Sequence, residues 1–419
     1  MKTTSHLKST IIPWIRGSMR CAPLESAFLL VPLLLACFAL SQTAQAVNPA
    51  PGRPETSASV GASSDAQNFR NTALLRPAPT ITTFDVPGAG TGPSQGTISF
   101  MINPAGQITG FYFDASNLRH GFLRAPDGAI TTFDAPGADQ GTRSLSINPA
   151  GAVAGFYRDA SFVAHGYLRT LDGTFTTFDA PGAGTGPFQG TVGGNINPAG
   201  VIAGTYIDSS DVNHGFVRVA DGTITTFDAP DAGTGPGQGT MVFFGNCLNP
   251  AGAISGASLD DNNVYHGFVR TPDGTITVFD VPGAGTGAFQ GTLGVTINQR
   301  GTIAGEYVDA SDVTHSFVRA ADGTITTFDV PGAGTNPGEG TFAESVNAPG
   351  DITGQYVDAS DVNHGFVRGK HGVITTFDFP GAGTGPGQGT IALSNNPVDA
   401  ITGYYIDAND VFHGFLRTP

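Results

Sequence analysis

A repeat of about 49 residues constrains the fold of this 419-residue chain more than any other feature. The dipeptide Phe-Asp recurs at intervals of 49, 45, 49, 52, 49 and 49 residues, from Phe84 to Phe377. A histidine followed by Gly or Ser and then an aromatic residue recurs in step with it, at His120, His165, His214, His266, His315, His364 and His413. Both markers occur seven times, which indicates seven copies of one structural unit.

Each copy has the pattern of four short strands separated by turns. In one copy the expected strands are residues 190–197, 201–208, 213–218 and 223–228. They are rich in β-branched and aromatic residues, and the segments between them contain Pro-Ala-Gly, Ser-Ser-Asp and Asp-Gly, which favour turns. Gly 60 and Pro 29, with only 13% charged residues, also favour turns and strands over helices.

Four antiparallel strands in a unit of this length predict an all-β, seven-bladed β-propeller. A long Gly-rich linker after each Phe-Asp leads from the outermost strand of one blade to the innermost strand of the next. The repeat region, residues 80–419, opens with a lone fourth strand at Thr80–Asp85 and closes with a third strand at Phe412–Arg417. We therefore expect a 3+1 closure, in which the N-terminal strand completes the last blade. A β-solenoid is the alternative, but its coils repeat at shorter periods and need no complementary strand.

The Asp-Gly turn sets the expected register of the outer hairpin. A two-residue type I′ turn would place Gly215 opposite Asp228, His214 opposite Ala229 and Phe216 opposite Phe227. The histidine and the Phe-Asp carboxylate then meet at one rim, so we expect all seven repeat histidines to be structural. One histidine per blade is too dispersed to form a zinc site, whose ligands must converge.

The first 79 residues are predicted to be processing and linker segments. Basic residues precede the apolar run Ala27–Leu40, and Ala44-Gln45-Ala46 is a small-x-small cleavage site, so residues 1–46 are typical of a signal peptide. Residues 47–79 are rich in Pro, Ser and Ala and are expected to be a flexible linker. The protein is then secreted, periplasmic or at the cell surface; lipidation at Cys37 is the less favoured alternative.

Charge and cysteine content limit the partners of the processed chain. Without residues 1–46, 15 Lys and Arg face 33 Asp and Glu, a net charge of −18 that would repel nucleic acid. No apolar run approaches the roughly 20 residues that a transmembrane helix needs. Cys247 is the only cysteine after residue 46, so no intrachain disulfide is possible, and its inner-strand position favours a buried, inert thiol. We expect a monomer.

The histidine segments resemble the bacterial extracellular HAF-repeat family, whose units carry a His-Ala-Phe core after an Asn-x-x-Gly turn. The core here is His-Gly-Phe in five units, His-Gly-Tyr at Tyr167 and His-Ser-Phe at Phe317. The resemblance spans residues 80–419 and implies an exported, propeller-like protein without an assigned activity or catalytic residues. The hairpin sequence DGTITTFDVPG is also similar to the repeats of streptogramin lyases, which suggests a propeller relative and not a lyase.

Paired acids in the turns between second and third strands are candidate cation ligands. These turns are expected on the same face as the Gly-rich linkers, which gives an acidic rim. Carboxylate oxygens suit calcium, so a weak Ca²⁺ site is one interpretation, and Asx-type turns on a solvated rim are the other. The candidates are Asp208, Asp211, Asp309, Asp312, Asp358, Asp361, Asp407 and Asp410. No other cofactor is expected.

Departures from the repeat are where an enzyme would carry its catalytic residues. The candidates are Glu306, Glu339, Glu344, Arg143, Arg158 and the Asn246-Cys247 pair in a lengthened first strand. They form no recognisable catalytic motif, so we predict a non-enzymatic binding module for an unknown extracellular ligand. An extracellular hydrolase or lyase and a purely structural surface protein are the alternatives. Sugar stacking would have to use tyrosines, namely Tyr112, Tyr206, Tyr307, Tyr356 and Tyr405, because Trp14 is the only tryptophan and lies within residues 1–46.

Overall fold

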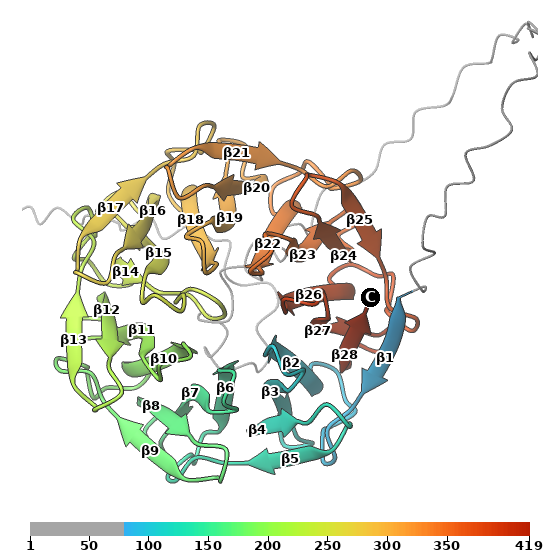
Figure 1. Ribbon diagram of the computed structural model, residues 1–419, viewed down its shortest axis with the longest axis horizontal. Coiled ribbons are helices and arrows are strands. Elements are labelled where there is room, and N and C mark those ends of the chain that lie inside the picture. Colours follow the sequence, from blue (N-terminus) through green and yellow to red (C-terminus); the bar gives the residue numbers. More distant parts are fainter. Residues whose placement is uncertain (1–78) are drawn as a thin grey trace, which may run out of the picture.

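The computed structural model describes residues 79–419, which form 28 β-strands and no helix (Figure 1). The prediction of an all-β fold is confirmed. The expected signal peptide, and the expected linker up to residue 78, lie outside the described residues. Among residues 79–419 there is no helix long and apolar enough to span a membrane.

The strands repeat in sets of four, which we number as units one to seven in chain order. The first strands are β2 (Gly96–Ile102), β6 (Thr142–Ile147), β10 (Gly190–Ile196), β14 (Gly239–Met241), β18 (Gly291–Ile297), β22 (Gly340–Val346) and β26 (Gly389–Asn395). The second strands are β3 (Ile108–Phe113), β7 (Val153–Arg158), β11 (Ile202–Ile207), β15 (Ile254–Leu259), β19 (Ile303–Val308), β23 (Ile352–Val357) and β27 (Ile401–Ile406). The third strands are β4 (Arg119–Arg124), β8 (Ala164–Arg169), β12 (Asn213–Arg218), β16 (Tyr265–Arg270), β20 (Thr314–Arg319), β24 (Asn363–Arg368) and β28 (Phe412–Thr418). The fourth strands are β5 (Ile130–Phe133), β9 (Phe175–Phe178), β13 (Ile224–Phe227), β17 (Ile276–Phe279), β21 (Ile325–Phe328) and β25 (Ile374–Phe377).

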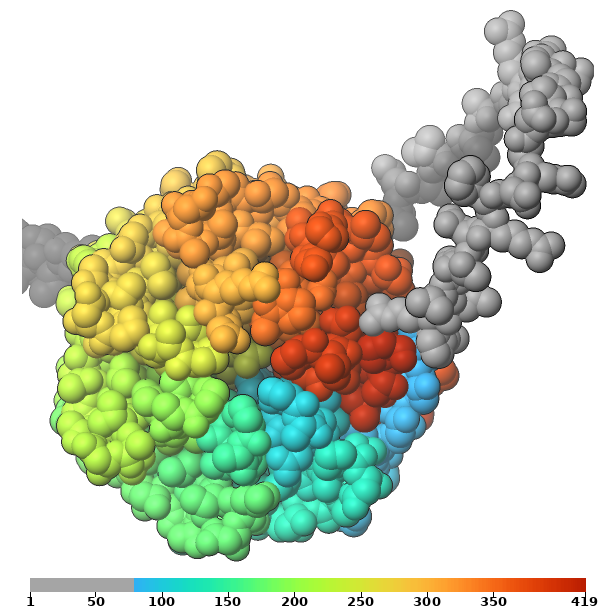
Figure 2. Space-filling view, viewed as in Figure 1, coloured from blue at the N-terminus to red at the C-terminus, as the bar shows by residue number. Residues whose placement is uncertain are grey.

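The units follow one another around a common axis and make a nearly closed sheet (Figure 1). First strands lie nearest the axis and fourth strands at the rim, as the sequence predicted. Unit seven has only three strands of its own. The first strand of the described chain, β1 (Thr80–Phe84), pairs antiparallel with β28, with Thr80 opposite Thr418 and Phe84 opposite Gly414. Figure 2 shows the blue N-terminal strand beside the red C-terminal segment.

The register of the outer hairpin differs from the prediction by one residue. Gly215 lies opposite Phe227 and Phe216 opposite Thr226, so the predicted Gly215–Asp228 and Phe216–Phe227 pairs were wrong. The cause is the turn, which has three residues instead of two. Gly222 alone takes a left-handed conformation, with a φ of 96°, and its N–H bonds to the carbonyl of Val219. A type I turn followed by a left-handed glycine is a common three-residue hairpin.

This register explains the glycine that follows six of the seven repeat histidines; Ser316 follows His315. A Cβ on Gly215 would lie 2.4 Å from the ring of Phe227, so the rim phenylalanine folds over the space that the glycine leaves. The same ring packs edge-on against Phe268 of the next unit, with centroids 6.1 Å apart. The predicted aromatic pair therefore exists between units and not across the hairpin.

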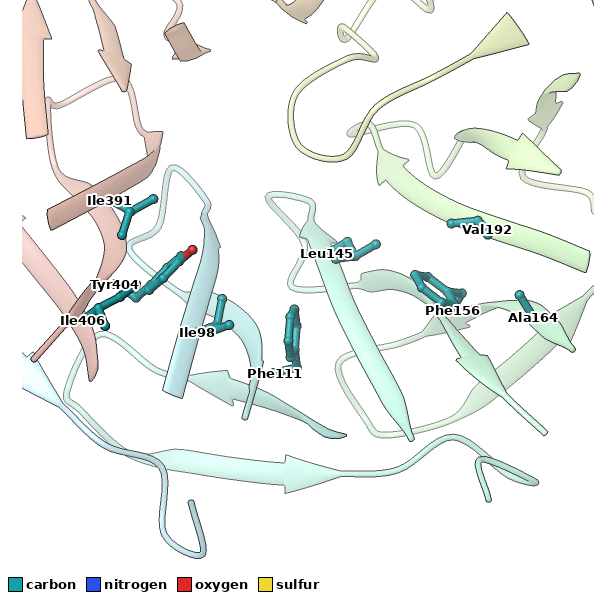
Figure 3. Packing of buried hydrophobic residues seen from close by; sticks show 9 residues of the cluster. All are labelled: Ile98, Phe111, Leu145, Phe156, Ala164, Val192, Ile391, Tyr404 and Ile406. Atoms are coloured by element: carbon teal, nitrogen blue, oxygen red, sulfur yellow. The ribbon is translucent and has the colours of Figure 1, made fainter. Parts of the chain in front are cut away.

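The hydrophobic core lies between neighbouring units. One cluster joins Ala304 of unit five to Val330 and to Ala343, Ile352 and Phe366 of unit six. Another runs through units seven, one, two and three near the axis, and Figure 3 shows its side chains interleaved between adjacent sheets. Each unit thus buries its faces against two neighbours, which a single unit could not do alone.

Seven asparagines at the ends of the first strands form a ring of hydrogen bonds, which we call the asparagine ring. Each Nδ2 donates to the backbone carbonyl of the equivalent asparagine in the next unit, over 3.0 to 3.4 Å. The last bond runs from Asn396 back to Asn103. The members are Asn103, Asn148, Asn197, Asn249, Asn298, Asn347 and Asn396. These residues also cap their own turns; Asn197 Oδ1, for example, accepts N–H bonds from Ala199 and Val201.

Deletion of residues 80–86 should destabilise the protein and should loosen unit seven first. The deletion removes the strand that covers β28 and the contact between Asp85 and His413. At about 1 kcal/mol per hydrogen bond, the loss should amount to several kcal/mol. Hydrogen exchange followed by peptide mass spectrometry should show faster exchange across residues 389–419 than elsewhere.

The control is a deletion of seven residues within 56–62, upstream of the strand. It should leave the melting temperature and the exchange pattern close to those of the full chain. Equal destabilisation by both deletions would contradict a specific role for β1.

Candidate functional site

Each repeat histidine lies between two carboxylates at the outer edge of its unit. In unit three, His214 Nδ1 is 2.9 Å from Asp228 Oδ1, and Nε2 is 3.6 Å from Asp208 Oδ2. The other units repeat this arrangement, with Nδ1 distances of 2.9 to 3.0 Å and Nε2 distances of 3.4 to 3.7 Å. We call this group the histidine clasp. Because both ring nitrogens face a carboxylate of the same unit, the clasp ties the rim hairpin to the turn between the second and third strands.

The tyrosines considered for sugar stacking are part of the clasp. Tyr206 stacks on His214 with ring centroids 4.8 Å apart, and five other units repeat the stack at 4.8 to 5.1 Å. These tyrosines are buried. The sugar-stacking interpretation is therefore wrong for them, since a platform for a sugar must expose one face of the ring.

The first acid of each turn caps that turn. Asp208 Oδ1 accepts hydrogen bonds from the N–H groups of Ser210 and Val212 at 2.8 and 2.9 Å. Burial raises the pKa of Asp208, but these bonds, together with His214, outweigh it and hold the pKa below its ordinary value. The same Oδ1 bonds cap the turns at Asp309, Asp358 and Asp407.

The second acid of each turn holds the Gly-rich linker. Asp211 has a left-handed φ of 63°, and its Oδ1 accepts a bond of 2.9 Å from Gln189 Nε2. Asp312 and Asp410 accept the equivalent bonds from Gln290 and Gln388.

Unit six departs from this pattern because Glu339 replaces the linker glutamine. Both oxygens of Glu339 accept bonds from Asn336, so Glu339 has no donor to offer Asp361. Burial raises the pKa of Asp361, and the charges of Glu339 and Asp358 raise it further. Glu339 is thus a linker residue, directly before β22.

Within residues 79–419, no three or more His, Cys, Asp or Glu side chains converge in the way that metal ligands do. The predicted rim acids lie in turns around the ring, and all of them except Asp361 are engaged in capping or linker bonds. A weak Ca²⁺ site at these residues stays a prediction.

Unit four is the most altered copy at the rim. Ser258 stands where most units have the clasp tyrosine, and Asp231 stands where the linkers have glycine. The Ser258 hydroxyl donates to Asp231 Oδ1 at 2.7 Å, so the two changes compensate each other. Burial alone would lower the pKa of His266, but Asp280, with Asp231 and Asp260, outweighs it and raises that pKa.

Unit four also carries a longer segment near the axis, residues 242–248, which we call the axial loop (Figure 1). Phe244 stacks against Phe156 of unit two, with ring centroids 6.3 Å apart. Asn246 Nδ2 donates to Ser345 Oγ of unit six at 3.0 Å. Cys247 Sγ donates to the carbonyl of Val295 in unit five, and burial raises the pKa of this thiol to about 12. The predicted buried, inert thiol agrees with this environment.

The two arginine departures in unit two have packing partners. The guanidinium of Arg143 lies 5.1 Å from the centroid of the Phe156 ring. Arg158 lies 5.1 Å from the Phe188 ring and donates to the carbonyl of Phe162 at 2.9 Å. Neither arginine is part of the group formed by Glu306 and Glu344, which is described next.

Two of the three symmetry-breaking glutamates come together between units five and six. Glu306 lies on β19 and Glu344 on β22, and these strands contact each other across the boundary between the units. Gln355, on β23, lies near Glu344 and lowers its pKa. Its role was missed because glutamine carries no charge; the signal is its position, which is equivalent to that of Glu306 one unit earlier. We call Glu306, Glu344 and Gln355 the acidic wall.

The environment of the acidic wall disfavours the charged form of both glutamates. Burial, followed by the charge of Glu344, raises the pKa of Glu306 well above its ordinary value. Burial also raises the pKa of Glu344 to about 8, and the Gln355 side chain offsets part of that rise. Carboxyls with such pKa values stay largely protonated near neutrality unless a cation neutralises them.

Comparison with known proteins gives a fold but no family. No protein-family model matches the chain, and no curated protein matches it. Among solved structures, a streptogramin B lyase is 14% identical, with a TM-score of 0.54 over 81% of this chain and 98% of that chain. Virginiamycin B lyase from Staphylococcus aureus is 16% identical, with a TM-score of 0.50 over 82% of this chain and 100% of the lyase. At this identity the likeness establishes a β-propeller fold and nothing about activity.

Substitution of Asp208 separates the capping role of its oxygen from the role of its charge. Asp208→Ala removes the acceptor and should cost about 1 kcal/mol of stability. Asp208→Asn keeps an acceptor without charge and should cost less. Because the folded pKa is lowered, stability from the charge is present above the unfolded pKa of about 3.9 and is lost as pH falls through the folded value.

Urea unfolding at neutral pH and below the folded pKa measures both effects. The gap between wild type and Asp208→Asn should close in acid, while Asp208→Ala stays less stable at both values. An Asn variant as weak as the Ala variant at neutral pH, or a gap that persists in acid, would contradict this assignment.

Proposed function

We propose that this chain is a seven-bladed propeller of four-stranded blades, closed 3+1 by β1, and that it acts outside the cytoplasm as a non-enzymatic binding module. The pairing of β1 with β28 supports the closure, and so does the clasp that Asp85 completes with His413. The bond from Asn396 to Asn103 supports it on the axial side. Export is inferred from the composition of residues 1–46.

The observation that carries the binding function is the contrast between the rim and the acidic wall. At the rim, the histidines, tyrosines and turn acids bond to one another in nearly the same way in every unit. The departures at Glu306, Glu344 and Asn246 gather instead near one boundary between units. A ligand site needs polar groups that the fold does not already use, and the acidic wall has them.

The same geometry disfavours nucleophilic catalysis by the most reactive side chains. The Cys247 thiol is buried, with a pKa of about 12, so it carries almost no thiolate near neutrality. The repeat histidines each have both ring nitrogens against carboxylates, so none is positioned to activate a nucleophile.

An extracellular hydrolase or lyase is the second candidate, and one observation favours it. Two carboxyls with raised pKa values lie together, and Glu344, with a pKa of about 8, would be protonated at neutral pH. A protonated carboxyl beside a second one is a common arrangement for general acid–base catalysis.

A double substitution, E306Q/E344Q, separates these functions. The wild type and the variant are assayed for co-sedimentation with insoluble cell-wall polysaccharide and for turnover of chromogenic glycosides, esters and lactones. Our proposal expects polysaccharide binding that falls at least about tenfold in the variant, with no turnover above background by either protein.

Three results would overturn the proposal. Turnover that the variant loses would establish the enzyme. Polysaccharide binding that the variant retains would place the ligand site elsewhere. An absence of both binding and turnover would favour a purely structural surface protein. E339Q is the matched control, because Glu339 is also a buried departure from the repeat but lies in a rim linker.

A further inference from the structure

Three side-chain oxygens of the acidic wall lack hydrogen-bond partners. They are Glu306 Oε1, Glu344 Oε1 and Gln355 Oε1, and all three atoms are buried. Glu306 is 2% exposed and Gln355 is 3% exposed. Buried polar atoms in folded proteins are almost always paired, so three orphaned oxygens in one cluster need a specific explanation.

Among residues 79–419, neither Glu306 nor Glu344 makes an ion pair with a cationic side chain. The third-strand arginines of nearby units are engaged at the rim, where Arg319 and Arg368 lie over the rings of Phe279 and Phe328. Two buried, unpaired carboxylates would cost several kcal/mol, so either protons or a bound cation must neutralise them.

Local backbone geometry brings these oxygens together. The pairing of β22 with β23 shifts register between Ala343 and Ser345, so Glu344 sits at an irregularity of the strand. A β-bulge re-aims the side chain at that position. Gln355 lies opposite Phe342, two residues before Glu344, on the neighbouring strand β23.

Glu344 as a whole is partly exposed on the innermost strand of its unit, although its Oε1 is buried. Asn246 of the axial loop bonds Ser345, the next residue along that strand, and so covers it from unit four. Water could therefore complete the coordination of a small ion without opening the fold.

The donor set selects the class of ligand. Two carboxylates and one amide supply only oxygen, which hard divalent cations prefer, and two carboxylates balance one divalent charge. The nearby Cys247 thiol is protonated and donates to Val295, which leaves no soft ligand for zinc or copper. We propose that Glu306, Glu344 and Gln355 bind one hard divalent cation, Ca²⁺ or Mg²⁺, at the boundary between units five and six. This inference rests on the acidic wall being the binding site proposed above.

Isothermal titration of the chelator-stripped protein with CaCl₂ and, separately, MgCl₂ tests the site. One ion should bind per chain, and a saturating concentration should raise the melting temperature by several degrees. The ion that binds more tightly identifies the preferred cation. E306Q/E344Q should lose this binding at least about a hundredfold, and without metal it should be no less stable than the stripped wild type, because it lacks the unpaired charges.

Proton release provides a second measurement. Since the ion must displace any proton that the carboxyl pair holds, its affinity should rise with pH. Titrations in two buffers of different ionisation enthalpy count the protons released. If the double variant fails to fold, the single variant E344Q, at the half-buried position, replaces it in these titrations.

The rim variant D309N/D312N removes two candidate ligands of the predicted weak rim site and so tests that alternative; the acidic wall should still bind the ion in this variant. An absence of heat and of any melting shift with either salt, up to about 10 mM, would overturn the inference and leave protons as the neutralising groups. Binding that survives in E306Q/E344Q but disappears in the rim variant would also overturn it. A protein that binds no ion but still binds polysaccharide would keep the proposed function, so the two failures are distinguishable.

Discussion

The asparagine ring is the interaction on which the rest of the structure depends. Each ring asparagine satisfies its own turn through Oδ1 and a buried carbonyl of the next unit through Nδ2. Because buried backbone groups must be paired, this one residue type fixes both the end of each inner strand and the spacing of consecutive strands. The ring thereby sets the spacing between adjacent units, and the hydrophobic clusters fill the space between them.

The histidine clasp repeats this logic at the rim, where β1 supplies the last carboxylate. Inner and outer polar networks are both periodic, and both leave few unused donors or acceptors. Periodicity of this kind favours stability over recognition, because a side chain that every unit needs for its own turn is not free for a ligand. The acidic wall differs because its oxygens belong to no periodic network.

The sequence predicted the strands closely, because turn residues and β-branched runs alternate so regularly. The third strand 213–218 is identical to β12, and the other three expected strands exceed the observed ones by one or two residues at their ends. The hairpin register was wrong because Asp-Gly fits both two-residue and three-residue turns, and only the backbone at Gly222 distinguishes them. The meeting of Glu306 with Glu344 was not predictable, since it depends on the packing of one unit against the next. Gln355 was missed for the same reason.

Because the units are nearly identical, they could assemble in a wrong order during folding. Any rim hairpin could dock against the wrong neighbour, or against a second chain, with almost the same contacts. Among the described residues the axial loop occurs once, and it touches units two, three, five and six. Those contacts form together only when these four units surround the loop in their native positions. The loop therefore favours the native arrangement of the units. A swapped or misaligned ring would keep the contacts between repeats but would lose the contacts of the loop.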